Sequence, residues 1–444
     1  HAFVKWPAEL LSQMFAFASQ DDINAPVVLS HVCSSWRHIA IRSPDLWTHV
    51  VFDRRIDMWK ERIRRSRNRP LYMQMSSSPN SSRHTFPDFD DAHLCMHTIA
   101  PHIHRLRSLA VSYTHRTPYL FNATLSELCA PPTNDNVHAR ILESLSLIHP
   151  ANDDNKVFFL FGGVAPRLKD VSLDGVRLAW LPSVFGNLVN LKYTHHGFLT
   201  GSDAVHEVLC MLKTSSMLET LTISFSRSSR DVYIAGNHLV SLTRLRRLAL
   251  QLITNFIPPE LVMVALSLEA PNLTDLHLDV RDGVQSDFVQ TSAIPNILDH
   301  FHHHRRLSHV RAMGGWFHGR SILSLVSTLP CLRHITAMGP HVSDAFLVRL
   351  GGAGEEALQR KGQRSRRSVP CPNLSTLDLS LCHSVTIHGV RGLICGRMSS
   401  EATLDLVRVR QCAKLYPQAF INYGTSAVDV RRQPDGFDLW PWRC

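Results

Sequence analysis

The stretches LTRLRRLALQL at residues 242–252 and LTDLHLDV at residues 273–280 carry the pattern that decides the fold. Each contains a six-residue frame with leucine at its first, fourth and sixth positions: Leu245, Leu248 and Leu250 in one, and Leu273, Leu276 and Leu278 in the other. Residues two apart on a strand point to the same face of a sheet. The last two leucines of the frame therefore predict a short strand with one apolar side, while the residue between them points outward.

The same frame returns along the chain with conservative substitutions, at intervals of 20 to 42 residues. These intervals overlap the 20–29 residues of leucine-rich repeats and run somewhat longer. One such unit cannot close its own core, but stacked neighbours bury their leucines in a row. The further copies are Leu106/Leu109/Val111, Leu142/Leu145/Leu147, Leu168/Val171/Leu173, Leu188/Leu191/Tyr193, Leu218/Leu221/Ile223, Leu307/Val310/Ala312, Leu332/Ile335/Ala337, Leu374/Leu377/Leu379 and Leu404/Val407/Val409.

We therefore expect the α/β class, with a leucine-rich-repeat solenoid built from a curved, mostly parallel sheet and outer helices. The apolar spacing of residues 202–212 and 259–268 is typical of those outer helices, and Pro258 and Pro259 suit a helix start. An ordinary α/β sheet with strands and helices in periodic alternation is the alternative. It would bury the same leucines but would lack a long curved binding face.

Composition narrows the class of protein. A formal charge of +10 and 27 histidines favour acidic partners, and because no recognition motif accompanies the basic residues, nucleic acid is not an expected partner. No run approaches the ~18 uncharged apolar residues that a membrane span requires. The ten cysteines include no Cys-x-x-Cys pair, which argues against a compact zinc site and a disulfide-dense secreted domain. We expect a cytoplasmic or nuclear location, or both.

The N-terminal segment has two helical patterns. Residues 6–19 present one apolar face, and Pro7 suits the first turn of this helix. A second apolar helical face runs from Pro26 to Ala40, and Ser43 and Pro44 are expected to end that helix. Two short amphipathic helices bury little apolar surface. The favourable free energy of burial is about 25 cal/mol per Å², and the loss of conformational entropy on folding is of comparable size. We therefore expect them to pack on the next segment, on the rest of the chain or on a partner protein.

The sequences WPAELLSQMF at 6–15 and VVLSHVCSSWRHIAIRSPDLWTHV at 27–50 resemble the F-box, in the form common in mushroom-type fungi. The matching elements are a proline, an acidic residue and paired aliphatics before a phenylalanine, then Val-Cys, Trp-Arg and Leu-Trp in order. The resemblance covers roughly the first fifty residues. The residues that it marks for adaptor binding are Pro7, Glu9, Leu10, Leu11, Phe15, Val32, Cys33, Trp36, Leu46 and Trp47.

The resemblance implies a function. An F-box docks onto a Skp-type adaptor, which connects it to a cullin and a ring protein, while the rest of the chain holds a protein substrate. The expected function is thus the substrate-recognition subunit of an SCF-type ubiquitin ligase. The alternative is a repeat scaffold with a basic surface that acts outside ubiquitin transfer. Strand alternation alone suggests a substrate face at Ser172, Thr222, Ala249, His277 and Asp378.

The expected domains are an F-box at 1–52, a linker helix with a first strand and loop at 53–91, and repeats at 92–444. Residues 351–368 contain four glycines, four arginines and one lysine and predict a basic polar loop; nuclear targeting or contact with an acidic partner is the alternative. The stretch FDLWPW at 437–442 is expected to cap the last repeat, unless it is a peptide motif. The chain starts at His1, so we expect residues before it to be missing.

No motif for catalysis is present in the sequence. A phosphate-binding Gly-x-x-x-x-Gly-Lys-Ser/Thr loop, a Gly-x-Ser-x-Gly elbow and a His-Glu-x-x-His pair are all missing, so we expect no enzyme, no catalytic residues and no cofactor. Histidines cluster at 300–304 after Asp299. Because neighbouring side chains on one helix diverge, we expect a solvated basic patch there and no metal. The pairs His102/His104 and His195/His196 have the same interpretation.

Overall fold

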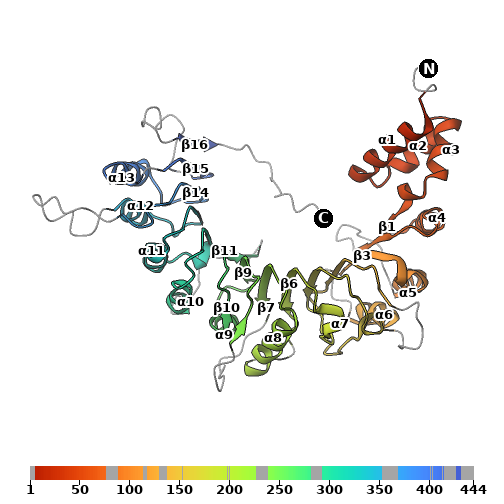
Figure 1. Ribbon diagram of the computed structural model, residues 1–444, viewed down its shortest axis with the longest axis horizontal. Helices are drawn as coiled ribbons and strands as arrows, with labels where there is room; N and C mark the ends of the chain where they lie inside the picture. The colour runs from red at the N-terminus through yellow and green to blue at the C-terminus, as the bar shows by residue number, and fades with distance from the viewer. Residues whose placement is uncertain are drawn as a thin grey trace, which may run out of the picture. The chain divides into compact units, whose positions relative to one another are not determined.

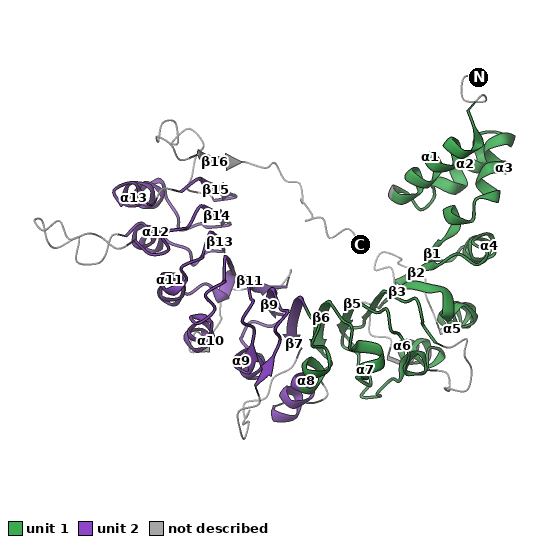
Figure 2. Ribbon diagram, viewed as in Figure 1, with its two compact units in different colours: residues 1–199, 210–218 green, residues 200–209, 219–444 purple. Residues whose placement is uncertain are grey.

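The computed structural model describes residues 6–76, 89–113, 118–129, 138–152, 154–197, 199, 201–226, 239–281, 293–352, 369–400, 402, 404–412, 414 and 427–431. Parallel strands alternate with helices through this part of the chain (Figure 1). The chain divides into two compact units, residues 1–199 with 210–218 and residues 200–209 with 219–444 (Figure 2). None of the described helices has both the length and the apolar character needed to cross a bilayer.

Unit 1 opens with a helical module made of α1 (Ala8–Asp21), α2 (Ala25–Val32), α3 (Ser34–Arg42) and the 3-10 helix η2 (Pro44–Trp47). The apolar pattern from Pro26 to Ala40 is interrupted at Cys33, whose backbone is extended with φ −157° and ψ 171°. The Cys33 thiol then accepts the backbone N–H of Trp36 at 3.5 Å and caps α3. A cysteine cap thus makes two helices where the periodicity indicates one.

Six parallel strands of unit 1 pair in chain order: β1 (His49–Phe52), β2 (Leu71–Ser76), β3 (Leu106–Ser112), β4 (Ser144–Ile148), β5 (Asp170–Asp174) and β6 (Asn190–His195). The helices between them are α4 (Ile56–Arg65), α5 (Phe89–Ile99), α6 (Pro118–Glu127) and α7 (Pro182–Phe185). The sheet thus begins at His49, and the segment expected as a linker supplies a helix and a strand. The domain boundaries themselves stay a prediction.

Unit 2 continues the same architecture. Its parallel strands are β7 (Thr220–Phe225), β9 (Arg247–Leu252), β11 (Asp275–Val280), β12 (His309–Met313), β13 (His334–Met338), β14 (Thr376–Ser380), β15 (Leu406–Arg410) and β16 (Ala427–Arg431). Its helices are α9 (Pro259–Leu266), α10 (Ala293–Phe301), α11 (Gly319–Thr328), α12 (Asp344–Leu350) and α13 (Ile387–Met398), and α8 (Ser202–Thr214) is divided between the units. Short strands β8 (Val240–Ser241) and β10 (Leu268–Glu269) form a separate pair.

The leucine frames form the core of both units. All three apolar positions of every predicted frame are at most 4% exposed, the least buried being Val171 and Tyr193. Burying an aliphatic side chain of this size contributes about 2 kcal/mol, so the rows of stacked leucines are a main source of stability. The predicted fold class is confirmed: parallel strands with outer helices, arranged as a leucine-rich-repeat solenoid.

Strands β13, β14 and β15 are each followed directly by a residue with a positive φ angle. The φ angles are 121° at Gly339, 56° at Leu381 and 52° at Gln411. The second residue after β14 and after β15 is a buried cysteine, and the thiol of Cys382 donates to the carbonyl oxygen of Ser380 at 3.2 Å. The equivalent bond from Cys412 to the carbonyl oxygen of Arg410 is 3.4 Å. Each thiol is a second donor to a carbonyl that already accepts a backbone N–H, from Gly339 at 3.0 Å for Ser380 and from Leu381 at 3.1 Å for Arg410.

Arg397 joins α13 to the chain on both sides of the basic insertion. It is 1% exposed. Its guanidinium donates to the carbonyl oxygens of Ala402 (2.9 Å), Leu350 (3.1 Å), Pro370 (3.1 Å) and Cys371 (2.7 Å). A buried cation with this many carbonyl partners holds the three segments in one arrangement.

Close contact between α12 and α13 depends on glycine. A Cβ added at Gly396 would overlap the carbonyl oxygen of Gly351, and one at Gly389 would overlap the carboxylate of Asp344. That carboxylate accepts the backbone N–H of Thr386 at 2.7 Å and its hydroxyl at 2.6 Å. The two helices therefore approach each other backbone to backbone.

Candidate protein-interaction surfaces

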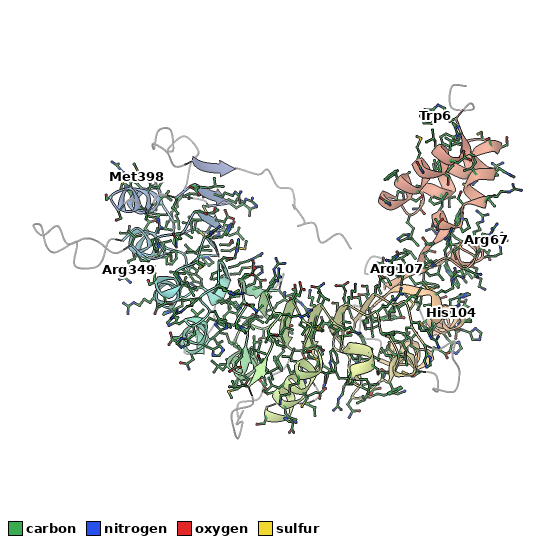
Figure 3. The ribbon with its side chains drawn as sticks, in the orientation of Figure 1. Trp6, Arg67, His104, Arg107, Arg349 and Met398 are labelled. Atoms are coloured by element: carbon green, nitrogen blue, oxygen red, sulfur yellow. The ribbon has the colours of Figure 1, made fainter. Side chains whose placement is uncertain are left out.

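The helical module exposes a set of large apolar side chains. On α1, Leu10, Met14 and Phe17 recur at steps of four and three, which places them on one helical face, and Phe17 is 69% exposed. Exposed apolar clusters of this kind mark interaction sites. The complete set, which we call the module face, is Trp6, Leu10, Met14, Phe17, Val28, Val32 and Ile41; Trp6 lies at the start of the module (Figure 3).

The structure divides the residues that the sequence marked for adaptor binding. Leu11, Phe15, Leu46 and Trp47 are at most 3% exposed and form the core of the module with Ala40. Pro7, Glu9, Leu10 and Val32 are exposed, while Cys33 and Trp36 are half-buried. The buried members can support an adaptor only through the fold of the module; the exposed ones are available for contact.

Several members of the module face lie outside the marked set. Met14, Phe17, Val28 and Ile41 are each at least 37% exposed. The available signal was helical spacing, since Met14 and Phe17 follow Leu10 by four and seven residues, whereas Leu11 and Phe15 lie on the neighbouring, buried face. Spacing alone could not decide which of the two apolar faces is turned inward.

Arg62 of α4 connects the module to the first strand. It is 3% exposed, and its guanidinium donates to the carbonyl oxygen of Ile23 at 2.7 Å and to that of His49 at 3.4 Å. Its guanidinium lies 5.7 Å from the centroid of the Trp47 ring, and that of Arg65 lies at 4.5 Å. Burial, with the nearby Arg55 charge, lowers the pKa of Arg62. Cation–π contacts and carbonyl bonds thus attach the module to α4 and β1 within unit 1.

The predicted substrate-face residues follow the strand register. Thr222, Ala249 and His277 are aligned neighbours on β7, β9 and β11, and Asp378 lies in the same row on β14. Ser172 holds the equivalent row of unit 1, aligned with Ser146 and Lys192. Four of the five are partly exposed, but Ala249 is 5% exposed. The register of the sheet places these residues in rows, and their role in binding stays a prediction.

Ion pairs and imidazoles distinguish the outward strand positions of unit 2. The carboxylate of Asp279 lies 3.1 Å from Nε of Arg311. The Asp378 carboxylate lies 3.0 Å from Nε2 of His334 and 3.6 Å from Nη1 of Arg408. Sequence alternation placed His277 and Asp378 here but did not single out this network, because it joins residues of different strands that are 30 to 44 positions apart in the sequence.

Electrostatics differ among these groups. Burial alone would raise the pKa of Asp378, but the hydrogen bond from His334 and the charges of Arg408 and Arg410 outweigh it and hold the pKa below its ordinary value. Burial is the main cause that lowers the pKa of His277, and Asp279 opposes it. The Asp378 carboxylate is therefore stabilised in its ionised form, while the His277 imidazole resists protonation.

The histidine cluster is dispersed over separate contacts. His300 Nε2 lies 2.9 Å from the carbonyl oxygen of Leu268, and His302 Nε2 lies 3.5 Å from the carboxylate of Asp299. His304 is 9% exposed, and burial lowers its pKa. The solvated patch that the sequence suggested is thus wrong for His304. That interpretation is also wrong for His195 and His196, which are buried, with ring centroids 4.1 Å apart. His102 is half-buried and His104 is exposed.

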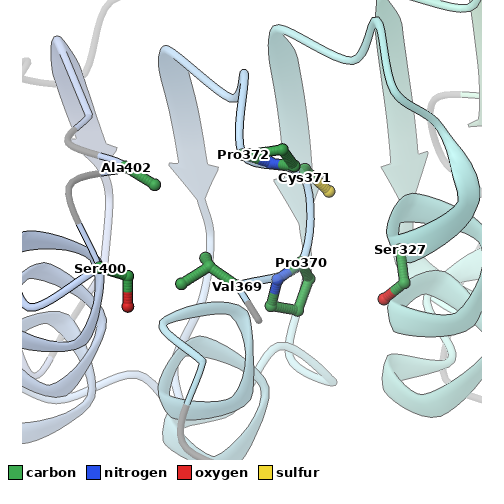
Figure 4. Close-up of a pocket in the computed structure, with 7 residues that line it drawn as sticks. All are labelled: Ser327, Val369, Pro370, Cys371, Pro372, Ser400 and Ala402. Carbon is green, nitrogen blue, oxygen red and sulfur yellow. The ribbon is translucent and has the colours of Figure 1, made fainter. Parts of the chain in front are cut away.

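A hollow of about 400 Å³ lies near the Arg397 anchor, lined by Ser327, Val369, Pro370, Cys371, Pro372, Ser400 and Ala402 (Figure 4). Its one thiol belongs to Cys371, whose pKa burial raises to about 12. A thiol with that pKa stays protonated at neutral pH and is a poor nucleophile. The Cys371 thiol therefore supplies no thiolate to this hollow at neutral pH. Most of the basic insertion and all of the C-terminal aromatic stretch lie outside the described residues.

Comparison with known proteins finds no matching family model and no matching curated protein. Among solved structures, a chain of the TLR13–ssRNA13 complex has 12% identity and a TM-score of 0.35, over 73% of this chain and 52% of that one. The chain thus spans about half the length of that relative.

A chain from the crystal structure of the Rad7 and Elc1 complex in yeast has 13% identity and a TM-score of 0.37, over 95% of this chain and 92% of that one. Both scores lie below 0.5, so neither likeness decides fold or function. The leucine-rich-repeat assignment rests on the chain's own buried frames and parallel strand register.

Proposed function

We propose that this protein is the non-catalytic substrate-recognition subunit of an SCF-type ubiquitin ligase. The N-terminal module would act as an F-box that binds a Skp-type adaptor and, through it, a cullin and a ring protein. The repeats would hold a protein substrate. A cytoplasmic or nuclear location, or both, belongs to the same proposal.

The module face carries this proposal. Leu10, Phe17 and Val32 are 49%, 69% and 57% exposed, although the module has a complete core of its own. Fully burying an exposed side chain of this kind contributes roughly 1.5–3 kcal/mol, and because these three are about half to two-thirds exposed, roughly half of that free energy is still to be gained. A partner that covers them recovers this free energy, as expected of a helix face that fits an apolar groove. The resemblance to the F-box names the kind of partner.

Attachment of the module supports the same function. Since Arg62 binds the backbone at Ile23 and His49, the helices and the first strand of unit 1 form one body. A receptor benefits from this arrangement because a bound adaptor is then fixed relative to the strands that follow it. The strand faces supply the second requirement, which is a surface for the substrate.

A pull-down with purified Skp-type adaptor tests the proposal. We compare the wild-type chain with the double variant Leu10→Asp, Val32→Asp, which places two charges on the module face and leaves its core intact. The matched control is Phe256→Asp, Met398→Asp, at apolar positions that are 43% and 45% exposed outside the module. We expect only the module variant to lose the adaptor, with unchanged far-UV circular dichroism for both.

Two results would count against the proposal. If the wild-type chain does not bind the adaptor, the module is not an F-box in function, and a repeat scaffold acting outside ubiquitin transfer becomes the better explanation. If both variants lose binding equally, the adaptor contacts apolar surface without regard to the module.

A further inference from the structure

The outward positions of β9 to β15 form a charged surface, which we call the unit 2 strand face. It contrasts with β3 and β4 of unit 1, where Ser108, Ala110, Ser144 and Ser146 are small and uncharged. Four arginines minus three aspartates give the unit 2 strand face a net charge of +1 before its imidazoles are counted. These residues are Arg247, Arg311, Arg408, Arg410, Asp275, Asp279 and Asp378, with His277, His309 and His334.

The carboxylates of this face are already paired. Asp279 and Asp378 lie against Arg311 and Arg408, as described above. Asp275 accepts the hydroxyl of Thr274 at 2.5 Å and lies 3.6 Å from Nδ1 of His309. Asp279 and Asp378 are thus neutralised by arginines of the same face, whereas the partners of Asp275 are a hydroxyl and an imidazole.

Arg247 differs from Arg311 and Arg408, which are paired with carboxylates of this face. Within the described part of the chain it forms no ion pair, and its Nε is shielded from solvent without a hydrogen-bond partner. A shielded guanidinium N–H that donates to nothing costs roughly 1–3 kcal/mol, and more when the group is charged. Because the Arg247 side chain as a whole is only half-buried, a carboxylate supplied by a partner can approach the guanidinium and neutralise its charge.

Two imidazoles adjoin Arg247. His309 and Arg247 align with Asp275 on either side, and His277 is the outward residue two positions along the same strand as Asp275. Burial lowers the pKa of both imidazoles; Arg247 and Arg311 add to this at His277, and His334, Arg247 and Arg333 add to it at His309. Asp275 opposes the shift at both, as does Asp279 at His277.

We propose that the unit 2 strand face binds an acidic segment of a partner protein, and that a carboxylate of this segment is held by Arg247 beside His277 and His309. The inference rests on the proposed function, since it names the chemistry of the substrate that the repeats hold. A partner carboxylate next to the two imidazoles favours their protonated form. Binding therefore takes up protons, and affinity rises as the pH falls.

Fluorescence anisotropy with a labelled peptide of six Asp-Ser repeats tests this on the full chain. At pH 7.5 we expect Arg247→Gln to weaken binding roughly tenfold or more, the effect of one charge-assisted hydrogen bond. The matched control Arg391→Gln removes the same charge from an exposed position on α13 and should change affinity less than about twofold. Because Arg247 has no ion pair within the described residues, its loss leaves the fold intact, and Arg247→Lys provides a second variant with the charge retained and an intermediate affinity.

Three results would overturn the proposal: no binding of the acidic peptide, equal binding of a Lys-Ser peptide, or equal losses in Arg247→Gln and Arg391→Gln. A second measurement at pH 5.8 should show tighter binding by the wild type and no gain in the variant His277→Gln, His309→Gln. Unchanged wild-type affinity would remove the imidazoles from the site.

Failure of the proposed function is seen separately. The Arg247→Gln chain should still bind the Skp-type adaptor, and the module variant should still bind the acidic peptide. Loss of adaptor binding by the wild type with peptide binding intact would reject the ubiquitin-ligase role and retain the acidic partner.

Discussion

Trp47 donates its indole N–H to the carbonyl oxygen of Ala40 at 2.8 Å, and both residues are buried. This bond joins η2 to the last turn of α3. On its other side the Trp47 ring is covered by the guanidinium of Arg65. Trp47 thus contacts both α3 of the module and α4, the helix between β1 and β2.

Replacing Trp47 by phenylalanine should destabilise the chain by about 1–3 kcal/mol. The carbonyl oxygen of Ala40 would keep only the 3.4 Å hydrogen bond from the Ser43 N–H, and the ring would offer less surface to the Arg65 guanidinium. Urea unfolding followed by circular dichroism measures the change. Trp6→Phe, at a 42% exposed position, should stay within about 0.5 kcal/mol of wild type. Equal effects of the two substitutions would contradict the assigned role of Trp47.

Leu10 and Leu11 are neighbours with opposite predicted effects. Leu11→Ala should cost about 2–5 kcal/mol of stability because it opens a cavity between Phe15 and Trp47 in the module core. Leu10→Ala should leave the free energy of unfolding within about 0.5 kcal/mol but weaken adaptor binding. Thermal unfolding and an adaptor titration separate the two. A stability loss of similar size in both variants would mean that Leu10 is not exposed.

Arg397→Lys should destabilise unit 2 by about 3–5 kcal/mol, since a lysine cannot donate to four carbonyl oxygens and would leave buried acceptors without partners. Denaturant unfolding measures the loss. Arg391→Lys on the same helix is the control, because that side chain is exposed. A Lys variant as stable as wild type would show that the charge matters and the guanidinium geometry does not.

Stability should rise with pH between about 5 and 7. The pKa of His277 is lower in the folded chain than the ~6.5 of an unfolded histidine, so below that value the unfolded chain binds more protons and acid favours unfolding. His277→Gln should flatten this slope, whereas His388→Gln at an exposed site should not. Unfolding curves at several pH values provide the test, and parallel slopes in all three proteins would exclude His277 as a contributor.

The frames of leucine could be read from the sequence because burial on one side of a strand demands the same two-residue spacing in every repeat. Strand β16 was missed, since Ala427, Val428 and Val430 lack the leading leucine of the frame. The break at Cys33 was missed for another reason: a thiol cap acts through one local hydrogen bond, which leaves no trace in apolar periodicity.

The interaction surfaces were only half predictable. Motif resemblance marked Leu10 and Leu11 alike, and only packing against Phe15 and Trp47 assigns one to the core and the other to the module face. The unpartnered Nε of Arg247 could not be found from sequence at all, because it depends on which residues the strand register brings beside it.

The anchor formed by Arg397 bears on how this chain can change in length. By binding Leu350 on one side and Pro370 and Cys371 on the other, it fixes both ends of the intervening segment. The entropic free-energy cost of closing a segment between two fixed ends grows only with the logarithm of its length, by about 0.6 kcal/mol for each doubling. Segments of very different length and composition can therefore be exchanged at this place while the leucine rows on either side keep their register, which makes it a site where new sequence can be acquired at a small cost in free energy.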